Sequence, residues 1–342
     1  MRVATIGLDI AKNVFQVHGA DATGAAVLKK RLRRNQVLEF FAAQSHCLVG
    51  IEACATGHHW AREIAAFGHE VRLLPPQYVK PYVKRHKNDA ADAEAICEAV
   101  TRPTMRFVPI KTTEQQSALM LHRTRELLVR QQNMTVNAIR AHLAEFGVVV
   151  AQGVQNVGKA IAIIEDERDD RVPEVAREAL QFLARQFAEL KMRTAGLTAK
   201  IAAWHRQNAL SQRLATVPGI GPITATALAA SITDPGQFKS ARQFAAWLGL
   251  VPRQNSSGGK EMLGAISKRG NVYLRRLLVT AAQSVLRWKI RRLEEATEWL
   301  RNLLARRPHN VVATALANKI ARVVWALMRK CEEYRAPLTA TP

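Results

Sequence analysis

The sequence lacks several features that would assign it to a membrane or secreted class. No run reaches 18 consecutive apolar residues, so we expect no membrane-spanning helix. The N-terminal segment MRVATIGLDIAKNV carries no secretory signal pattern, because Asp9 interrupts its apolar run and no small-residue cleavage site follows. Internal repeats of fixed period and low-complexity tails are also absent. These absences predict a cytoplasmic protein.

Cysteine is scarce, and its spacing fits no metal site. The four cysteines are Cys47, Cys54, Cys97 and Cys331. None forms a CxxC pair, and the histidines after the second cysteine have no further ligand pair at zinc spacing. We therefore expect reduced, mostly buried thiols.

Acidic residues are few relative to basic ones. The chain of 342 residues has 50 Lys and Arg against 28 Asp and Glu, a net charge of +22. The excess is concentrated near the C-terminus, since residues 251–335 hold 18 basic and 6 acidic residues. A basic bias of this size and localisation favours a polyanionic partner, most often nucleic acid, over a merely solvated surface.

Hydrophobic patterning predicts an α/β region followed by helical regions. Within residues 1–110, buried strands are predicted at RVATIGLDI, CLVGIEA and HEVRLLP, a hairpin at VFQVHGAD to AVLKKRL, and helices at GHHWAREIAAFG and DAADAEAICEAV. Residues 111–210 contain two long stretches of helical periodicity, which predict an antiparallel helical pair or coiled coil serving as a linker or dimer contact. Residues 211–335 predict a mostly helical C-terminal domain.

Four acidic residues occupy positions typical of a metal site. Asp9 and Glu52 each end a predicted buried strand, and Asp89 and Asp92 share one face at the start of a predicted helix. Each alone is explained equally well as a helix cap or turn residue. Convergence of all four would cost free energy through repulsion. Hard oxygen ligands around Mg²⁺ relieve that cost and suit phosphoryl transfer.

Two glycine-rich segments lie in the C-terminal region. In VPGIGPITA, Gly219 and Gly221 flank an interhelical turn resembling a helix-hairpin-helix, in which backbone N–H groups and a helix N-terminus contact phosphate. A tight turn without a ligand is an equal alternative, although the basic surroundings favour phosphate. The segment VPRQNSSGGKEMLGAISKRGN reads as a flexible loop, and serines beside glycines in loops are mostly structural.

The same motifs, taken in order, resemble a known family. GLDIAKNVF, GIEACATG and KNDAADAEAI resemble the ribonuclease-H-like, RuvC-type domain of DEDD insertion-sequence transposases, and VPGIGPITATAL, FKSARQFAAWLGLVPR, SSGGK and ISKRGNVYLRRLL resemble its second domain. The resemblance covers both ends of the chain, while the helical middle matches only in character. It implies that the four acids bind Mg²⁺ and that Ser257 is the nucleophile, with Ser256 as the fallback and Ser267 as a supporting hydroxyl.

The resemblance also implies the reaction and the partners. Family members are recombinases guided by a structured bridge RNA that the element encodes. A phosphoserine link to DNA would conserve bond energy during strand exchange, and a homodimer or homotetramer is expected because two duplexes are joined. The acids and the serine lie far apart in sequence, which leaves open a composite site between domains or between subunits. Phosphate-contacting groups are expected among Lys260, Lys268, Arg269, Arg275 and Arg276.

The sequence also leaves three alternative functions. A RuvC-like nuclease of the junction-resolvase type would use the same acids without a serine step, but leaves the C-terminal domain unexplained. A sugar or acetate kinase fits poorly, because no Asp-Gly-Thr phosphate motif follows and the net charge is +22. A non-catalytic nucleic-acid-binding protein would make the acids structural. Candidate RNA-contacting cations are Lys29, Lys30, Arg31, Arg33, Arg34, Lys80, Lys84, Arg85 and Lys87.

Overall fold

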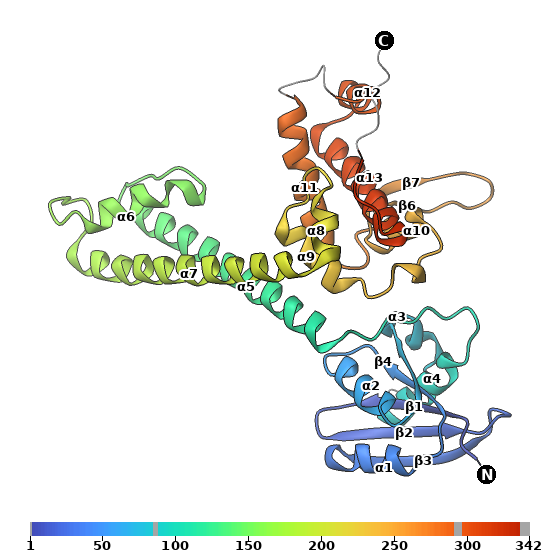
Figure 1. The fold of residues 1–342 in the computed structure, drawn as a ribbon. Coiled ribbons are helices and arrows are strands. Elements are labelled where there is room, and N and C mark those ends of the chain that lie inside the picture. Colours follow the sequence, from blue (N-terminus) through green and yellow to red (C-terminus); the bar gives the residue numbers. More distant parts are fainter. Residues whose placement is uncertain (1, 85–87, 291–295, 336–342) are drawn as a thin grey trace. The chain divides into compact units, whose positions relative to one another are not determined.

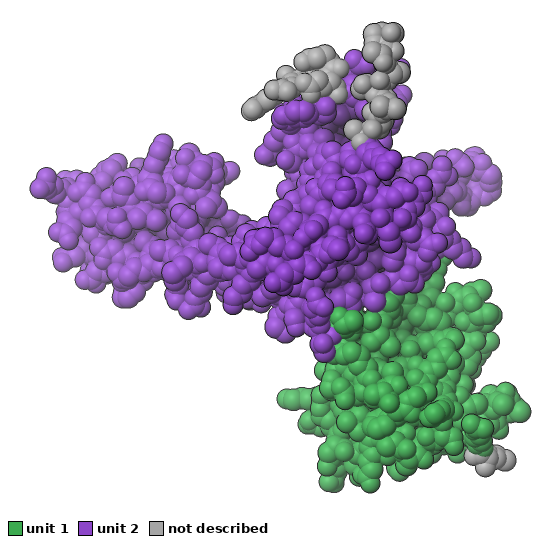
Figure 2. All heavy atoms as spheres, viewed as in Figure 1, with its two compact units in different colours: residues 1–112 green, residues 113–342 purple. Residues whose placement is uncertain are grey.

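The computed structural model describes residues 2–84, 88–290 and 296–335. The chain divides into two compact units, residues 1–112 and residues 113–342 (Figure 2). Each unit has its own hydrophobic core. The long helices predicted for residues 111–210 belong to the second unit, and the break between the units lies two residues after the predicted boundary at residue 110.

The N-terminal unit is built on a five-stranded mixed sheet (Figure 1). Its strands are β1 (Thr5–Ile10), β2 (Val14–Ala20), β3 (Ala26–Arg33), β4 (Leu48–Glu52) and β5 (Glu70–Leu74). Their order is β3-β2-β1-β4-β5, in which β2 is antiparallel to both β1 and β3, whereas β1–β4 and β4–β5 are parallel. The predicted strands and hairpin are confirmed, and the mixed sheet is consistent with a ribonuclease-H-like domain.

Helices cover both faces of this sheet. Side chains alternate along a strand, so Ile6 and Leu8 pack with α1 (Val37–Ala43) and α2 (Gly57–Ala65) in one core cluster. On the other face, α3 (Pro76–Val79) and α4 (Asp89–Val100) bury Leu74 and Ile96 in a second cluster. The alternation therefore decides which face each functional side chain reaches.

A long antiparallel helical pair begins the second unit. Helix α5 (Thr113–Glu145) packs along α7 (Glu174–Gln207), and α6 (Val157–Glu165) lies at the far end of the pair (Figure 1). The contacts run in opposite directions, since Arg125 Nε donates to Thr198 Oγ1 at 2.8 Å and Gln132 Nε2 donates to Thr194 Oγ1 at 2.7 Å. The predicted helical pair is therefore present.

The rest of the second unit is mostly helical, as predicted. Its elements are α8 (Ala209–Ala215), α9 (Pro222–Ser231), α10 (Ala241–Trp247), β6 (Pro252–Gln254), β7 (Leu263–Ile266), α11 (Val272–Ile290), α12 (Glu298–Arg306) and α13 (His309–Lys330). Short 3-10 turns occur at Arg34–Gln36, Lys80–Tyr82, Val154–Asn156 and Pro235–Gln237. One large core cluster joins these helices.

A buried polar group fixes the root of α5 against this core. His122 is 1 % exposed, with Nδ1 at 3.0 Å from Tyr273 Oη and Nε2 at 2.9 Å from Thr226 Oγ1. The Thr226 hydroxyl donates to the Pro222 carbonyl at 2.7 Å, so it accepts from His122 Nε2–H, and Nδ1 accepts from tyrosine. Burial, reinforced by the cation Arg125, lowers the pKa of His122 to about 4. The imidazole is therefore neutral at physiological pH.

Helix α13 is the only helix in the described ranges that is long and apolar enough to cross a membrane by length and composition. Half of its apolar window is buried inside the second unit, where Val312, Leu316 and Val324 belong to the core cluster. This inward-facing stripe is typical of the central helix of a folded domain.

Candidate functional site

Two of the predicted acids lie at the ends of adjacent parallel strands. The β1–β4 register pairs Gly7 with Gly50 and Leu8 with Ile51. Asp9 and Glu52 are the next residues along the two strands, so they are neighbours across the sheet. Strand alternation directs both carboxylates to the face that carries the two glycines, which is the face covered by α4.

The glycines allow α4 to approach the sheet closely. A Cβ on Gly7 would lie 2.1 Å from the Ala93 carbonyl oxygen, and one on Gly50 would lie 2.8 Å from Val100 Cβ. Cys97 Sγ lies 3.8 Å from the Thr5 carbonyl oxygen, so α4 runs antiparallel to β1. The N-terminus of α4 therefore lies at the carboxyl end of β1, where the acids are.

The first turn of α4 supplies the other two acids. Asp89 and Asp92 precede Ala93 and Ile96, which contact the sheet, by one helical turn each, so all four residues follow one stripe. The helix begins there because the Asn88 side chain accepts a hydrogen bond from Ala91 N–H at 2.8 Å. One helix face thus carries the packing surface and, beyond it, the acids.

The four carboxylates influence one another electrostatically. The pKa of Asp9 is raised from 3.8 to about 6, first by burial and then by the negative charges of Asp92, Asp89 and Glu52, in that order. A proton or a cation would relieve this repulsion. The structure therefore places the four acids predicted from the sequence near one another.

The donor set fits a hard divalent cation. All four groups offer carboxylate oxygens, which are preferred ligands of Mg²⁺, and burial together with the neighbouring negative charges raises the pKa of Asp9. The four carboxylates do not lie close enough to one another to form a complete set of metal ligands. Among residues 2–84, 88–290 and 296–335, no three His, Cys, Asp or Glu side chains already form a cluster able to hold a metal ion.

The segment that the sequence read as a flexible loop forms a β-hairpin. Strands β6 and β7 pair antiparallel, and Ser257 and Lys260 form a bridge beyond them, with Lys260 N–H donating to the Ser257 carbonyl at 3.1 Å. Gly258 and Gly259 have φ of +56° and +76°, the left-handed pair required at the centre of a type I′ turn. The Gly-Gly pair therefore sets the hairpin turn.

The hairpin distinguishes the two adjacent serines. Ser256 Oγ accepts a hydrogen bond from Met262 N–H at 3.2 Å, which ties it to the opposite strand. Ser257 is exposed at the turn, and no hydrogen bond of its hydroxyl is found within the described residues. Ser267 N–H donates to the Val251 carbonyl at 2.8 Å at the hairpin base. Ser257 is thus the serine whose hydroxyl is both exposed and uncommitted.

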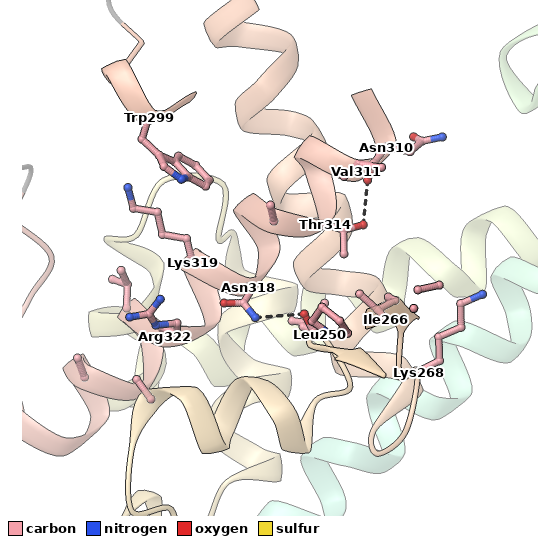
Figure 3. A pocket seen from close by; sticks show the side chains of 17 residues that line it. Leu250, Ile266, Lys268, Trp299, Asn310, Val311, Thr314, Asn318, Lys319 and Arg322 are labelled. Atoms are coloured by element: carbon pink, nitrogen blue, oxygen red, sulfur yellow. Dashed lines mark hydrogen bonds between the residues drawn. The ribbon is translucent and has the colours of Figure 1, made fainter. Parts of the chain in front are cut away.

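The base of the hairpin is held firmly. Asn318 of α13 points at the chain entering β6 and donates to the Leu250 carbonyl at 3.1 Å (Figure 3). Beside it lies a groove of about 1180 Å³ with an apolar floor. Lys268, Lys319 and Arg322 line it, and no acid is among its described lining residues (Figure 3). The β6–β7 hairpin is therefore anchored at its base and exposed at its tip.

A close backbone crossing completes this base. A Cβ on Gly270, where φ is +79°, would lie 1.8 Å from the Trp247 carbonyl oxygen. Arg275, only 9 % exposed, donates from Nη1 to the carbonyls of Leu248 and Arg269, both at 2.9 Å. Since buried carbonyls need partners, this guanidinium supports the loop that leads from the hairpin.

The predicted phosphate-contacting cations therefore differ in their surroundings. Lys260, Lys268 and Arg269 are exposed around the hairpin. Arg276 is exposed and pairs with Glu126 at 2.6 Å. Arg275 is committed to backbone carbonyls, so its position differs from the surface location expected from the sequence. Its burial could not be read from a run of basic residues.

The two glycines of the predicted helix-hairpin-helix turn differ in how closely other atoms surround them. Gly219 has φ of +86°, and a Cβ there would lie 2.6 Å from the Ala281 carbonyl oxygen of α11, so internal packing explains this glycine. Gly221 is exposed at the N-cap of α9, with nothing within 4 Å of a built Cβ. Only Gly221 thus has open space in front of a helix N-terminus.

The expected RNA-contacting cations Lys29, Lys30, Arg31, Arg33 and Arg34 are exposed along β3 and the turn after it. Lys80 is exposed as well, and Lys84 is paired with Glu94. Arg85 and Lys87 lie outside the described residues. Exposed cations are therefore concentrated on β3, an edge strand of the sheet that carries Asp9 and Glu52.

Comparisons with known proteins cover both of these regions. A model of DEDD transposases of IS110 elements matches residues 6–147, and a model described as "Transposase IS116/IS110/IS902 family" matches residues 211–298. The chain is 48% identical to a "Probable family 20 transposase" of Pseudomonas aeruginosa, covering 98% of this chain and 99% of that protein. The chain belongs to the IS110 transposase family. It is therefore an enzyme of DNA transposition.

Transposases of named insertion sequences are also similar along nearly the whole chain. The transposase of IS1328 from Yersinia enterocolitica is 41% identical over 95% of this chain and 96% of its own length. That of IS1111A from Coxiella burnetii is 39% identical over 97% and 92%. The first family match spans all four acids, and the second spans the hairpin with Ser257. Both regions therefore belong to the transposase architecture.

Proposed function

We propose that this transposase cuts and rejoins DNA through two groups, the carboxylates Asp9, Glu52, Asp89 and Asp92 and the hydroxyl of Ser257. The observation that carries the proposal is the close packing of α4 on Gly7 and Gly50, which gathers the acids and raises the pKa of Asp9 to about 6. Carboxylates held together at such a cost are typical of functional sites.

The four carboxylates would hold Mg²⁺. When bound, the metal supplies positive charge that offsets the carboxylates and stabilises charge on a phosphate in transfer. Asp9 and Glu52 are fixed by the β1–β4 register, and Asp89 and Asp92 by the packed helix. The chain thus orients its ligands before any metal binds.

Ser257 would be the nucleophile. Its Oγ attacks a DNA phosphorus, a P–Oγ bond forms, and the P–O bond to one strand end breaks. The leaving strand oxygen takes up a proton as the serine loses one. A hydroxyl of another strand reverses the step, so exchange conserves the number of phosphodiester bonds. Lys260 and Arg269, exposed on and beside the hairpin, offset charge on the phosphate.

Target choice would come from base pairing with a bridge RNA encoded by the element. The net charge of +22 and the exposed basic strand β3 support a polyanionic partner beyond the cleaved DNA. Exchange between two duplexes requires several active sites, so a homodimer or homotetramer acting on DNA in the bacterial cytoplasm is expected.

The test is a strand-exchange reaction with the full chain, end-labelled element DNA, Mg²⁺ and RNA transcribed from the flanking segment. The wild type should form a labelled protein–DNA adduct that survives denaturation. Ser257→Ala should abolish adduct and exchange. Ser256→Ala is the matched control, because it removes a neighbouring hydroxyl that the hairpin uses internally, and it should keep both.

Two results would contradict the proposal. Full strand exchange by Ser257→Ala would favour a metal-dependent nuclease without a serine step. Unchanged activity of Asp9→Asn and Asp92→Asn would make the acids structural. Omission of the RNA tests guidance separately, since exchange at the programmed target should then be lost while DNA binding persists.

A further inference from the structure

A separate hollow lies in the N-terminal unit, where the β1–β2 turn meets the turn after β3. Its volume is about 610 Å³. It is lined by Asn13, Val14, Arg33, Arg34, Asn35 and Trp60. The strand register pairs Ile10 with Phe15 and Val14 with Arg33, so the hollow lies at the end of the sheet that carries Asp9.

Trp60 shows which face of the sheet the hollow uses. The indole belongs to the core cluster that includes Ile6 and Leu8, whereas Asp9 points to the face covered by α4. The hollow and the carboxylates therefore share one end of the sheet but lie on opposite faces. The hollow is thus separate from the proposed metal site.

The walls of the hollow are tied together by the backbone. Arg34 N–H donates to the Asn13 carbonyl at 3.0 Å, and Arg34 Nη1 donates to the Lys12 carbonyl at 3.3 Å. Arg33 N–H donates to Gln36 Oε1 at 2.9 Å. The two bonds from Arg34 join turns that are distant in sequence, so the hollow is formed before any ligand arrives.

The Arg34 side chain is held as a flat platform. Its guanidinium lies 5.1 Å from the Trp60 ring centroid and 6.0 Å from that of Phe15. The aromatic rings support one side of the cation, yet Arg34 is exposed. A planar cation fixed in this way offers a surface on which an unpaired base can stack.

The hollow carries two cations, and the tryptophan that lines it has an indole nitrogen without a partner among the described residues. Trp60 is 4 % exposed, and its Nε1 is the only buried side-chain nitrogen or oxygen in the described ranges that lacks a hydrogen-bond partner. An unpaired buried donor costs free energy, because it has lost its hydrogen bond to water without gaining another. Arg33 and Arg34 add positive charge, and no acid is among the described lining residues. The charge of the lining therefore favours a negatively charged ligand.

We propose that this hollow binds one unpaired nucleotide of a nucleic-acid strand. Its base stacks against the Arg34 guanidinium, and its phosphate lies beside Arg33. The amides of Asn13 and Asn35 can both donate to and accept from a base edge. This proposal deepens the proposed function, because it assumes a nucleic-acid partner, but it depends on neither Ser257 nor a metal.

The test measures binding by the full chain in EDTA, which prevents metal-dependent cleavage. The probes are a labelled 12-nucleotide single-stranded RNA, the DNA of the same sequence, and the corresponding duplexes. Arg34→Ala removes charge and platform, and Arg34→Lys removes the platform alone. Arg31→Ala is the matched control, because it removes an exposed cation of β3 that does not line the hollow.

Arg34→Ala should weaken single-strand binding about tenfold, in line with the loss of one stacked base. Arg34→Lys should lose nearly as much, whereas Arg31→Ala should lose about twofold. Salt separates the two causes. Both alanine variants remove one positive charge and should have similar salt slopes, but only the Arg34 defect should persist when binding is extrapolated to high salt.

The RNA and DNA arms identify the strand that supplies the nucleotide, since only the true source should show the Arg34 defect at full size. Equal losses for Arg31→Ala and Arg34→Ala, an intact Arg34→Lys variant, or an equal defect on duplexes would overturn the proposal. Binding in EDTA needs neither cleavage nor a metal, so failure of the catalytic proposal is distinguishable from failure of this one.

Discussion

Neutralising Asp9 should stabilise the metal-free transposase, which is an unusual outcome for a change at a partly buried functional residue. Folding raises the pKa of this carboxyl from 3.8 to about 6, so the folded chain disfavours its charge. At about 1.36 kcal/mol per pKa unit, the full penalty at neutral pH is about 3 kcal/mol. Partial exposure screens the charges, so Asp9→Asn should gain about 1–2 kcal/mol.

The pH dependence has a definite sign. A group whose folded pKa is raised contributes stability that is fully present below its unfolded pKa of 3.8 and is lost as pH rises through about 6. The wild type therefore carries the penalty at pH 7.5 and little of it near pH 4. The advantage of Asp9→Asn should be largest at pH 7.5 and should shrink towards pH 4.

The assay is denaturant unfolding of the full chain in EDTA at both pH values, with hydrogen exchange of α4 as a local readout. Glu39→Gln removes an exposed acid of α1 and is expected to change stability by less than about 0.5 kcal/mol. Mg²⁺ at ten times its Kd should stabilise the wild type by about 1.4 kcal/mol and Asp9→Asn by less. A destabilised Asp9→Asn in EDTA at pH 7.5, or a gain independent of pH, would refute the repulsion argument.

Three further predictions concern the second unit. Arg275→Met should destabilise it by about 2 kcal/mol, because the buried Leu248 carbonyl and the partly buried Arg269 carbonyl lose their donor. Arg276→Met, at an exposed ion pair, should cost less than about 1 kcal/mol in the same denaturation assay. Gly270→Ala should lower the expression and melting temperature severely, because its Cβ would meet a carbonyl at 1.8 Å, while Gly258→Ala has open space and should cost only the 1–2 kcal/mol of left-handed backbone. His122, with its pKa lowered to about 4, should make stability fall by about 3 kcal/mol as pH drops from 6.5 to 4, and His122→Gln should flatten that slope.

Some features of the fold follow directly from local pattern. The strands, the hairpin of β2 and β3, and both long helices were predictable because period-two and helical periodicities are properties of neighbouring residues. The four acids were predictable because they stand at strand ends and at the start of a helix. The hairpin at Ser257 was interpreted as a loop, because its short strands are exposed on both sides and show no alternation. The Gly-Gly pair was the signal that could have identified it.

Other features had no local signal. Arg275 and Arg276 are adjacent in a basic run, yet one is buried on carbonyls and the other is exposed. The local sequence predicts phosphate contact at Gly219, but its surroundings are set by α11, some 60 residues further along the chain. Such differences depend on which distant element packs against a residue, and that information is not contained in the neighbouring sequence.

The sequence alone determined the charge of the chain, its periodic elements and the residue types available for chemistry, since these are local properties. Which of these residues lie close together depends on the tertiary structure alone. Gly7 and Gly50 let α4 pack against the sheet, and only then do its acids raise the pKa of Asp9. The platform of Arg34 over Trp60 likewise depends on two turns joined by backbone hydrogen bonds. Repulsion and stacking act over a few ångströms, and only folding sets distances on that scale.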